Sequence, residues 1–377
     1  MIRKLLTFAL TIAVLSGAAQ TMHAADPLVF ISAFAPGDKG AIHAYRLDVA
    51  TGRLREVHRT TDPENPFFMA LSPDRKFLYA THARQFSGSD DEQVAAYEIV
   101  GDDGQLKLLN RQSSRGRATC YVEVDATRKA VLVANYTSGS VTSLPVRKDG
   151  SLGEPASFFE HRDPGIAPSK RKATHAHCTV VSPDNRFVYA ADLAIDQVVS
   201  YRLEPTTAKL SPNQQPFVRT PRGAGPRHLT FHPNGKDVYV INETANSITS
   251  FSYESKTGVL IERQTIATVP EDFDGTSHTA DLKITPDGRF LYGTNRGHDS
   301  IAAYRIGADG RLTLLEIEPS LGKGPQNLAI TSGGELLLCA NMPGGNVVVF
   351  RIDSRTGRLS SAGEPLTVTM PSCIMIR

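Results

Sequence analysis

A segment of about 50 residues recurs along this chain, and this repeat constrains the fold more than any other feature of the sequence. Its first element alternates β-branched or aromatic residues with other residues, then reaches a turn and a leucine, as in AIHAYRLDVATGRL and IAAYRIGADGRL. Alternation with period two, followed by a turn that usually contains glycine, predicts strands joined by hairpins. This element occurs seven times and ends at Leu54, Leu106, Leu152, Leu210, Leu260, Leu312 and Leu359.

A second element lies between successive copies of the first and occurs six times, as in SPDRKFLYA from Ser72 and TPDGRFLYG from Thr285. Each copy is a polar, Pro- or Gly-bearing turn between two apolar strands, so that each repeat holds about four strands. Seven such units predict an all-β, seven-bladed β-propeller with four-stranded blades. We expect the C-terminal VTMPSCIMIR to pair beside the N-terminal LVFISAF, giving the velcro closure that completes the ring.

Residues 1–25 differ in kind from the remainder, which we expect to form one propeller domain over residues 26–377. Arg3 and Lys4 precede an apolar run of 15 residues, and small residues follow up to Ala24 and Ala25. This pattern predicts a secretory signal peptide cleaved near Ala25, and hence a periplasmic or secreted protein. A membrane span needs roughly 20 apolar residues, although an uncleaved anchor is the alternative.

The charge balance argues against a nucleic-acid or membrane surface. The full chain has 41 basic and 39 acidic residues, and loss of Arg3 and Lys4 with the signal leaves 39 of each. We therefore expect a monomer whose partner is a small molecule, with no nucleic acid and, after signal cleavage, no membrane. Four widely spaced cysteines match no metal or redox motif: Cys120, Cys178, Cys339 and Cys373. Export permits disulfides, but buried thiols are the interpretation that we favour.

Polar side chains in the strand or loop before each turn are the candidates for chemistry, because they can line the central channel. His175 and His177 are two residues apart, which on a strand places them on one face. Such a pair can supply a general base or two metal ligands, or it can be satisfied by backbone carbonyls. Because no further ligand is evident nearby, we predict no metal and no cofactor.

Three more candidate motifs, with four residues, follow in the next two repeats. Arg227 and His228 come after a Gly-Pro turn, where an Arg can hold a carboxylate, a phosphate or a developing oxyanion, or form a surface salt bridge. Glu243 and Arg296 each lie four residues after the repeated tyrosine of their own repeat, Tyr239 and Tyr292. This shared register predicts that the two side chains converge on one opening, although a Glu at a strand end can simply cap a turn.

These motifs resemble a known family when they are taken in order. HAHCTVVSPDNRFVY, GPRHLTFHPNG, NETANSI and TPDGRFLYGTNR, with NYTSGSV and the closing MPSC, are similar to the seven-bladed bacterial 6-phosphogluconolactonases. That family is in turn related to fungal carboxymuconate lactonizing enzymes of propeller type. The resemblance covers about Leu28 to Arg377.

The resemblance implies an active-site set of one His, one Glu and two Arg, here His177, Glu243, Arg227 and Arg296. It implies hydrolysis of a sugar lactone, with the base either His177 or Glu243. His175, His228 and Asp192 are expected to support the set or to bind substrate.

Two departures qualify that expectation. Gln326 stands where related sequences often have an Arg, and an exported protein is separated from cytosolic 6-phosphogluconolactone, so an extracytoplasmic lactone or sugar acid fits better. A binding propeller without catalysis and a lactonizing or isomerising enzyme are the alternatives.

Overall fold

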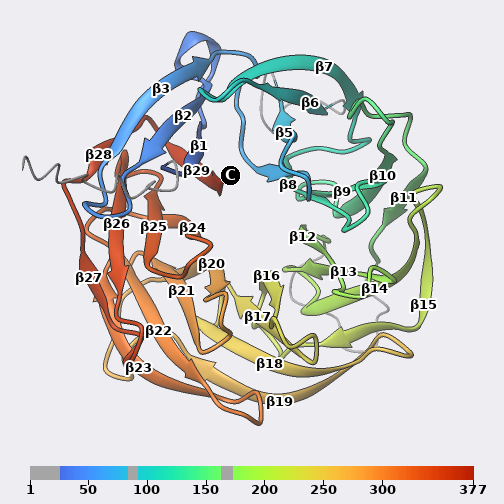
Figure 1. Ribbon diagram of the computed structural model, residues 1–377. Helices are drawn as coiled ribbons and strands as arrows, with labels where there is room; N and C mark the ends of the chain where they lie inside the picture. The colour runs from blue at the N-terminus through green and yellow to red at the C-terminus, as the bar shows by residue number, and fades with distance from the viewer. Residues whose placement is uncertain (1–25, 84–91, 163–172) are drawn as a thin grey trace, which may run out of the picture.

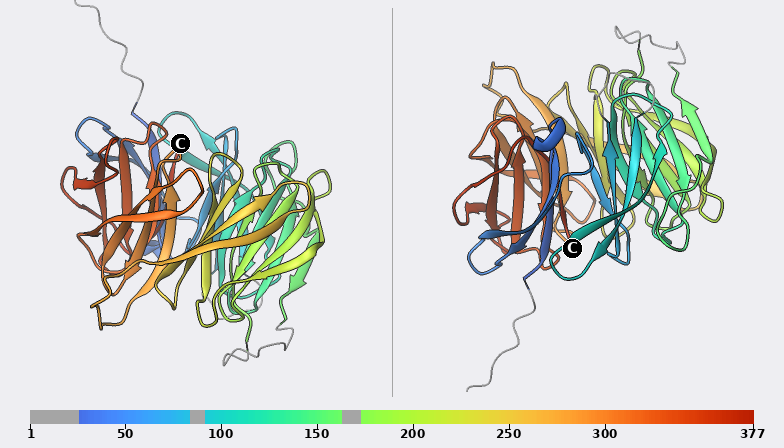
Figure 2. Two further views of the ribbon diagram at one scale, coloured as in Figure 1. Left: turned by 90° about the horizontal axis from the view of Figure 1, so that it is seen from below. Right: turned by 90° about the horizontal axis from the view of Figure 1, so that it is seen from above.

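The computed structural model describes residues 26–83, 92–162 and 173–377. Within them, seven antiparallel sheets stand around a central axis, and in six of them the first strand in sequence is innermost (Figure 1). This confirms the predicted seven-bladed all-β propeller with four-stranded blades. The predicted signal peptide lies outside the described residues. Figure 2 views the ring edge-on and shows the strands crossing the thickness of the disc.

The strands are grouped here by their place in a blade. The innermost strands are β4 (Met69–Leu71), β8 (Thr119–Val124), β12 (Ala176–Val181), β16 (Pro226–Phe231), β20 (His278–Ile284), β24 (Pro325–Ile330) and β29 (Pro371–Ile376). The second strands are β5 (Phe77–His82), β9 (Ala130–Asn135), β13 (Phe187–Asp192), β17 (Asp237–Asn242), β21 (Phe290–Arg296), β25 (Leu336–Asn341) and β1 (Leu28–Ala33). The third strands are β6 (Gln93–Val100), β10 (Ser140–Pro145), β14 (Gln197–Glu204), β18 (Ser247–Glu254), β22 (Ser300–Ile306), β26 (Asn346–Ile352) and β2 (Ala41–Leu47). The outer strands are β7 (Gln105–Ser113), β11 (Ser157–Glu160), β15 (Lys209–Arg219), β19 (Val259–Ala267), β23 (Leu312–Pro319), β27 (Leu359–Ser361) and β3 (Leu54–Thr60). A short strand, β28 (Leu366–Thr367), also pairs with β26, and a 3-10 turn, η1, covers Gly37–Lys39.

The two ends of the chain close the ring in one blade. β29 pairs antiparallel with β1, with Val29 opposite Ile376 and Phe30 opposite Met375. The closing blade therefore has the order β29-β1-β2-β3, and its innermost strand comes from the C-terminus (Figure 1). The predicted velcro closure is confirmed, and it leaves neither end of the ring as an open sheet edge.

A repeated tyrosine links each of four blades to the next one along the chain. Its hydroxyl donates to the carbonyl of a turn glycine in the next blade: Tyr79 to Gly150 at 2.9 Å, Tyr189 to Gly258 at 2.6 Å, Tyr239 to Gly310 at 3.0 Å and Tyr292 to Gly357 at 2.9 Å. Gly258 has a φ of +72°, and a Cβ there would lie 2.5 Å from the Phe187 ring. The tyrosine of the second element and the glycine of the first are thus two halves of one contact between blades.

The core consists of apolar layers between neighbouring blades rather than one central cluster. The repeated leucines belong to these layers, and Leu152, Leu260 and Leu312 are at most 3% exposed. All four cysteines are buried and free, as we favoured from the sequence. No helix within the described part of the chain has the length and apolar character of a membrane span.

Candidate active site

The predicted site residues meet at one end of the channel because of the antiparallel pairing within each blade. The start of each innermost strand lies beside the end of the second strand. His177 and Arg227 lie near the starts of β12 and β16, whereas Glu243 directly follows β17 and Arg296 ends β21. A register shift brackets His177 in β12 and Arg227 in β16, so each is the extra residue of a β-bulge. Bulges redirect side chains, and here they do so at equivalent positions of adjacent blades.

Glu243 joins two arginines from adjacent blades. Its Oε2 lies 2.9 Å from Nε of Arg227 and 2.9 Å from Nη2 of Arg296. The contact with Arg227 is an ion pair without good hydrogen-bond alignment. Glu243 and Arg296 therefore converge as their shared register suggested. One carboxylate holds two guanidinium groups together that would otherwise repel each other.

Arg227 is the most enclosed member of this cluster, at 1% exposure. Its Nη1 donates to the carbonyl oxygen of Ala280, and the same nitrogen lies 3.2 Å from Nε2 of His228. The alternative of a surface salt bridge is therefore wrong for this residue. A buried guanidinium whose donors are directed by fixed acceptors is suited to hold an anionic group at a defined place.

Arg296 is more accessible, with 27% of its side chain exposed. Its Nη2 donates to the carbonyl oxygen of Thr279 at 3.1 Å, and its Nη1 donates to Oε1 of Gln326 at 3.4 Å. Burial, with the neighbouring charge of Arg227, lowers the pKa of Arg296 to about 10. The side chain is therefore still a cation at neutral pH, and it can contact both Glu243 and a molecule in the opening.

His177 lies against the same cluster and is 6% exposed. Its ring packs edge-on against the rings of His228 and Tyr136, at centroid distances of 5.3 and 5.4 Å. Its Nδ1 lies 3.8 Å from the sulfur of Cys120. Burial, together with the positive charge of Arg227, holds the pKa of His177 well below its ordinary value. The imidazole is thus neutral at pH 7, which is the form that can accept a proton.

His175 and Asp192 lie beside the cluster rather than in it. β12 begins at Ala176, so the pleat that we expected to align the two histidines does not include His175. His175 nevertheless stacks on Tyr136 at 4.3 Å. Its backbone N–H donates to Oδ1 of Asp192, and Oδ2 of Asp192 accepts from His161, both at 2.8 Å. Asp192 is fully buried and anchors the segment that enters β12.

Sequence reasoning missed Tyr136 and Asp281 and treated Gln326 only as a departure from the family, although the repeat register places all three in this region. Tyr136 is the residue after β9, as Glu243 is the residue after β17. Gln326 is the bulged residue of β24, as Arg227 is of β16. Asp281 lies four residues before the turn at Thr285, just as His228 lies four residues before the turn at His232. The side chains of Asp281 and His228 are hydrogen-bonded to each other at 2.9 Å.

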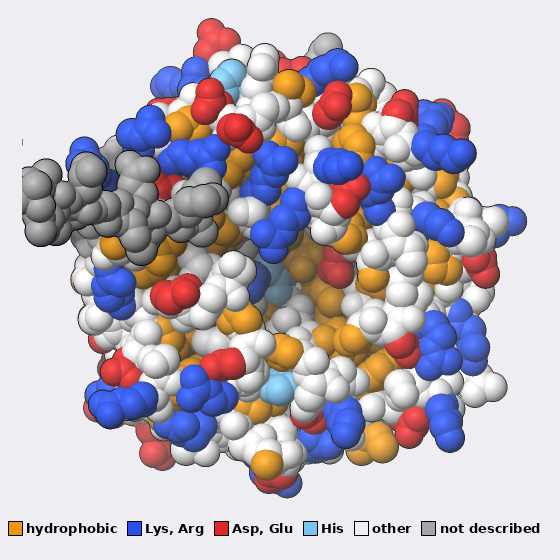
Figure 3. Space-filling view, in the orientation of Figure 1, with side chains coloured by type: hydrophobic (Ala, Val, Ile, Leu, Met, Phe, Trp, Pro, Cys, Tyr) orange, Lys and Arg blue, Asp and Glu red, His pale blue; other side chains and the backbone are white. Residues whose placement is uncertain are grey.

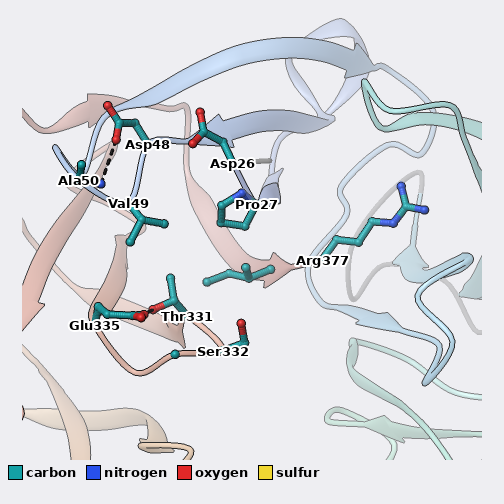
Figure 4. Close-up of a pocket in the computed structure, with 11 residues that line it drawn as sticks. Asp26, Pro27, Asp48, Val49, Ala50, Thr331, Ser332, Glu335 and Arg377 are labelled. Atoms are coloured by element: carbon teal, nitrogen blue, oxygen red, sulfur yellow. Dashed lines mark hydrogen bonds between the residues drawn. The ribbon is translucent and has the colours of Figure 1, made fainter. Parts of the chain in front are cut away.

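The ring is hollowed at its centre on the face shown in Figure 3, where His and Lys or Arg side chains are visible. A separate pocket of about 520 Å³ lies between the closing blade and its neighbour (Figure 4). Asp26, Asp48, Glu335 and Arg377 are among its lining residues, and none of the predicted site residues is. Among the residues that the structure describes, no three His, Cys, Asp or Glu side chains gather as a metal site would require.

Fold and site together define a seven-bladed propeller with a partly buried Arg–Glu–Arg cluster and a neutral histidine at one end of its channel. The model of the family described as "Lactonase, 7-bladed beta-propeller" matches residues 28–376, and the chain belongs to this family. The resemblance seen in the motifs is thereby confirmed.

Relatives and solved structures agree with this assignment. The chain is 33% identical over 346 residues to a 6-phosphogluconolactonase of Bacillus subtilis, covering 92% of this chain and 97% of the relative. It is 30% identical to a 6-phosphogluconolactonase of Formosa agariphila, covering 92% and 99%. Its fold matches a periplasmic gluconolactonase of Pseudomonas aeruginosa with a TM-score of 0.86 at 28% identity, covering 93% and 98% of the two chains.

Proposed function

We propose that this protein hydrolyses the ring ester of a sugar lactone, and that His177, Arg227, Glu243 and Arg296 do the chemistry. The observation that carries the proposal is the carboxylate of Glu243 bridging two guanidinium groups beside a neutral histidine. Membership of the lactonase family and the lactonase names of the relatives support it. The reaction needs a proton acceptor and fixed positive charge at the carbonyl oxygen, and the cluster contains both.

In the proposed reaction, the two guanidinium groups position the lactone and stabilise the charge that develops on its carbonyl oxygen. Arg227 is the fixed donor, because its guanidinium is bound to Ala280, His228 and Glu243. Preorganised donors of this kind need no rearrangement as the charge develops, which is why removing one typically costs about 10²- to 10³-fold in turnover.

His177 is the proposed base. It takes a proton from water as the water oxygen attacks the ring carbonyl carbon and a tetrahedral oxyanion forms. Collapse of that intermediate breaks the bond between the carbonyl carbon and the ring oxygen, and the protonated His177 returns its proton to that oxygen. The product is the open hydroxy acid. Glu243 is assigned the task of holding the two arginines together and aligned, since its Oε2 is engaged by both.

We also propose that the protein acts outside the cytoplasm on a lactone available there, with residues 1–25 as the signal peptide and residues 26–377 as the mature domain. The fold match to a periplasmic gluconolactonase supports this placement. N-terminal sequencing of the protein from a periplasmic fraction tests it: a start near Ala25 is expected, and an intact Met1 in that fraction contradicts it.

The function is tested by pH-stat titration of acid release from a lactone panel that includes glucono-1,5-lactone and its 6-phosphate. We expect release above the spontaneous rate, and a loss of about 10²-fold or more in Arg296→Ala and in His177→Ala with little change in melting temperature. Arg311→Ala is the matched control, because this exposed arginine, among the described residues, pairs with Asp309 and not with the site cluster. Folded protein that hydrolyses no lactone, or an Arg296→Ala variant with full activity, would contradict the proposal and favour a binding propeller.

A further inference from the structure

Asp281 is a buried carboxylate that the proposed reaction does not use, and it connects three blades. It is 1% exposed and accepts hydrogen bonds from four groups. Oδ1 lies 2.9 Å from Nδ1 of His228, and Nζ of Lys283 lies 2.9 Å from Oδ1 and 2.7 Å from Oδ2. Oδ2 also accepts from Nδ2 of Asn327 at 2.8 Å and from the backbone N–H of Leu328 at 3.0 Å. An ionised carboxylate only accepts, so each of these partners must donate.

This arrangement decides which nitrogen of His228 carries the proton. Burial, together with the charge of Arg227, lowers the pKa of His228 to about 4, so the ring is neutral at pH 7 and holds a single N–H. Since Nδ1 faces Asp281, the N–H is on Nδ1 and Nε2 keeps its lone pair. Nε2 lies 3.2 Å from Nη1 of Arg227, which can only donate, and the two atoms therefore match.

We propose that Asp281 is a positioning residue that fixes the tautomer of His228 and, through it, the direction of the Arg227 guanidinium. The proposal rests on the lactonase function proposed above. His228, the Ala280 carbonyl and Glu243 together engage Nη1 and Nε of Arg227. No acceptor among the described residues is bonded to Nη2, so this nitrogen is the one left to meet the substrate oxyanion.

The substitution Asp281→Asn separates this proposal from a purely structural one. Oδ1 of Asn327 accepts from the backbone N–H of Ile374 at 2.8 Å, so its amide group cannot turn and its Nδ2 continues to donate toward position 281. An asparagine there must present its oxygen to Asn327 and Leu328, and its own N–H₂ then faces Nδ1 of His228. The proton of His228 would move to Nε2, where it opposes an N–H of Arg227.

The experiment compares four variants in acid release from glucono-1,5-lactone and in thermal unfolding. Asp281→Asn and His228→Phe are each expected to lower kcat by up to about 10²-fold while KM changes less than about twofold, because Arg227 acts on the transition state. The double variant is expected to lose no more than the worse single variant, because the two residues act in series. Lys283→Met is the control: it also removes a contact of Asp281 but does not touch His228, and its kcat is expected to stay within about twofold.

The tautomer is measured without substrate, by ¹⁵N NMR of histidine-labelled protein with the His228 signals assigned from His228→Phe. Protonated Nδ1 in the wild type and protonated Nε2 in Asp281→Asn support the proposal. The same tautomer in both proteins, unchanged kcat in Asp281→Asn, or an equal loss in Lys283→Met overturns it. If the wild type hydrolyses no lactone, the proposed function fails while the NMR result still decides how Asp281 acts on His228.

Discussion

Glu243→Gln removes the only negative charge that contacts both site arginines among the described residues. Opposite unit charges about 4 Å apart interact by about 4 kcal/mol at an effective dielectric constant of 20, and the two arginines repel each other on a similar scale. Breaking a buried ion pair by removing one partner costs about 3–5 kcal/mol. Because Glu243 is 19% exposed and Arg296 is 27% exposed, solvent screens part of this energy. We therefore expect a loss of about 2–4 kcal/mol in the free energy of unfolding.

The loss can be measured by urea unfolding followed by tyrosine fluorescence, since the chain has 11 Tyr and no Trp. Asp309→Asn is the matched control, because its pair with Arg311 is exposed on both sides and should change stability by less than about 1 kcal/mol. Acetate should raise the melting temperature of Glu243→Gln more than that of the wild type, because a free carboxylate can bind the two arginines once their counter-charge is lost.

Two results would refute this reasoning. A Glu243→Gln variant as stable as the wild type would mean that the two guanidinium groups are solvated well enough to need no counter-charge. An unstable variant that acetate does not stabilise more than the wild type would mean that the cost comes from packing and not from charge.

Two further predictions concern the base and the contacts between blades. The pKa of His177 is held well below 6.5, so kcat/KM corrected for spontaneous hydrolysis should stay level as the pH falls through 6.5. A fall in kcat/KM with an apparent pKa of 6.5 or above would contradict the assignment of His177 as base. Tyr189→Phe removes the hydroxyl that donates to the Gly258 carbonyl, and it should lower the free energy of unfolding by about 1 kcal/mol with unchanged kcat. Gly258→Ala should lower it by about 1–3 kcal/mol, because the added Cβ meets Phe187 at a φ of +72°. If urea unfolding shows both variants to be as stable as the wild type, the contact between blades is refuted.

The repeat made the fold predictable because each copy carries its own strand and turn signals, and the blades use only contacts between neighbours. The repeated Tyr and Gly were visible in the sequence as separate motifs. The structure shows that they bond to each other across blades, for example from Tyr189 to Gly258. The closure of the ring was also predictable, since seven copies of one element and six of the other leave one unpaired strand at each end.

The sequence also determined which site residues lie at the same level along the channel axis. Glu243 and Arg296 share a register after their repeated tyrosines, and equal positions in adjacent blades must lie near each other in a closed ring. The same argument, applied to every repeat, would have brought in Tyr136 and Asp281 and placed Gln326 with them.

Only the tertiary structure decided the protonation and direction of these groups. The bulges that turn His177 and Arg227 toward the cluster have no marker in the sequence that sets them apart from ordinary strand positions. Burial makes His177 and His228 neutral, and the contact with Asp281, 53 positions further along the chain, sets the tautomer of His228. The sequence determines which groups are present and at what level along the channel axis they lie. The pKa of each group and the position of its proton depend on desolvation and on partners from other blades. Both of these exist only once the ring has closed.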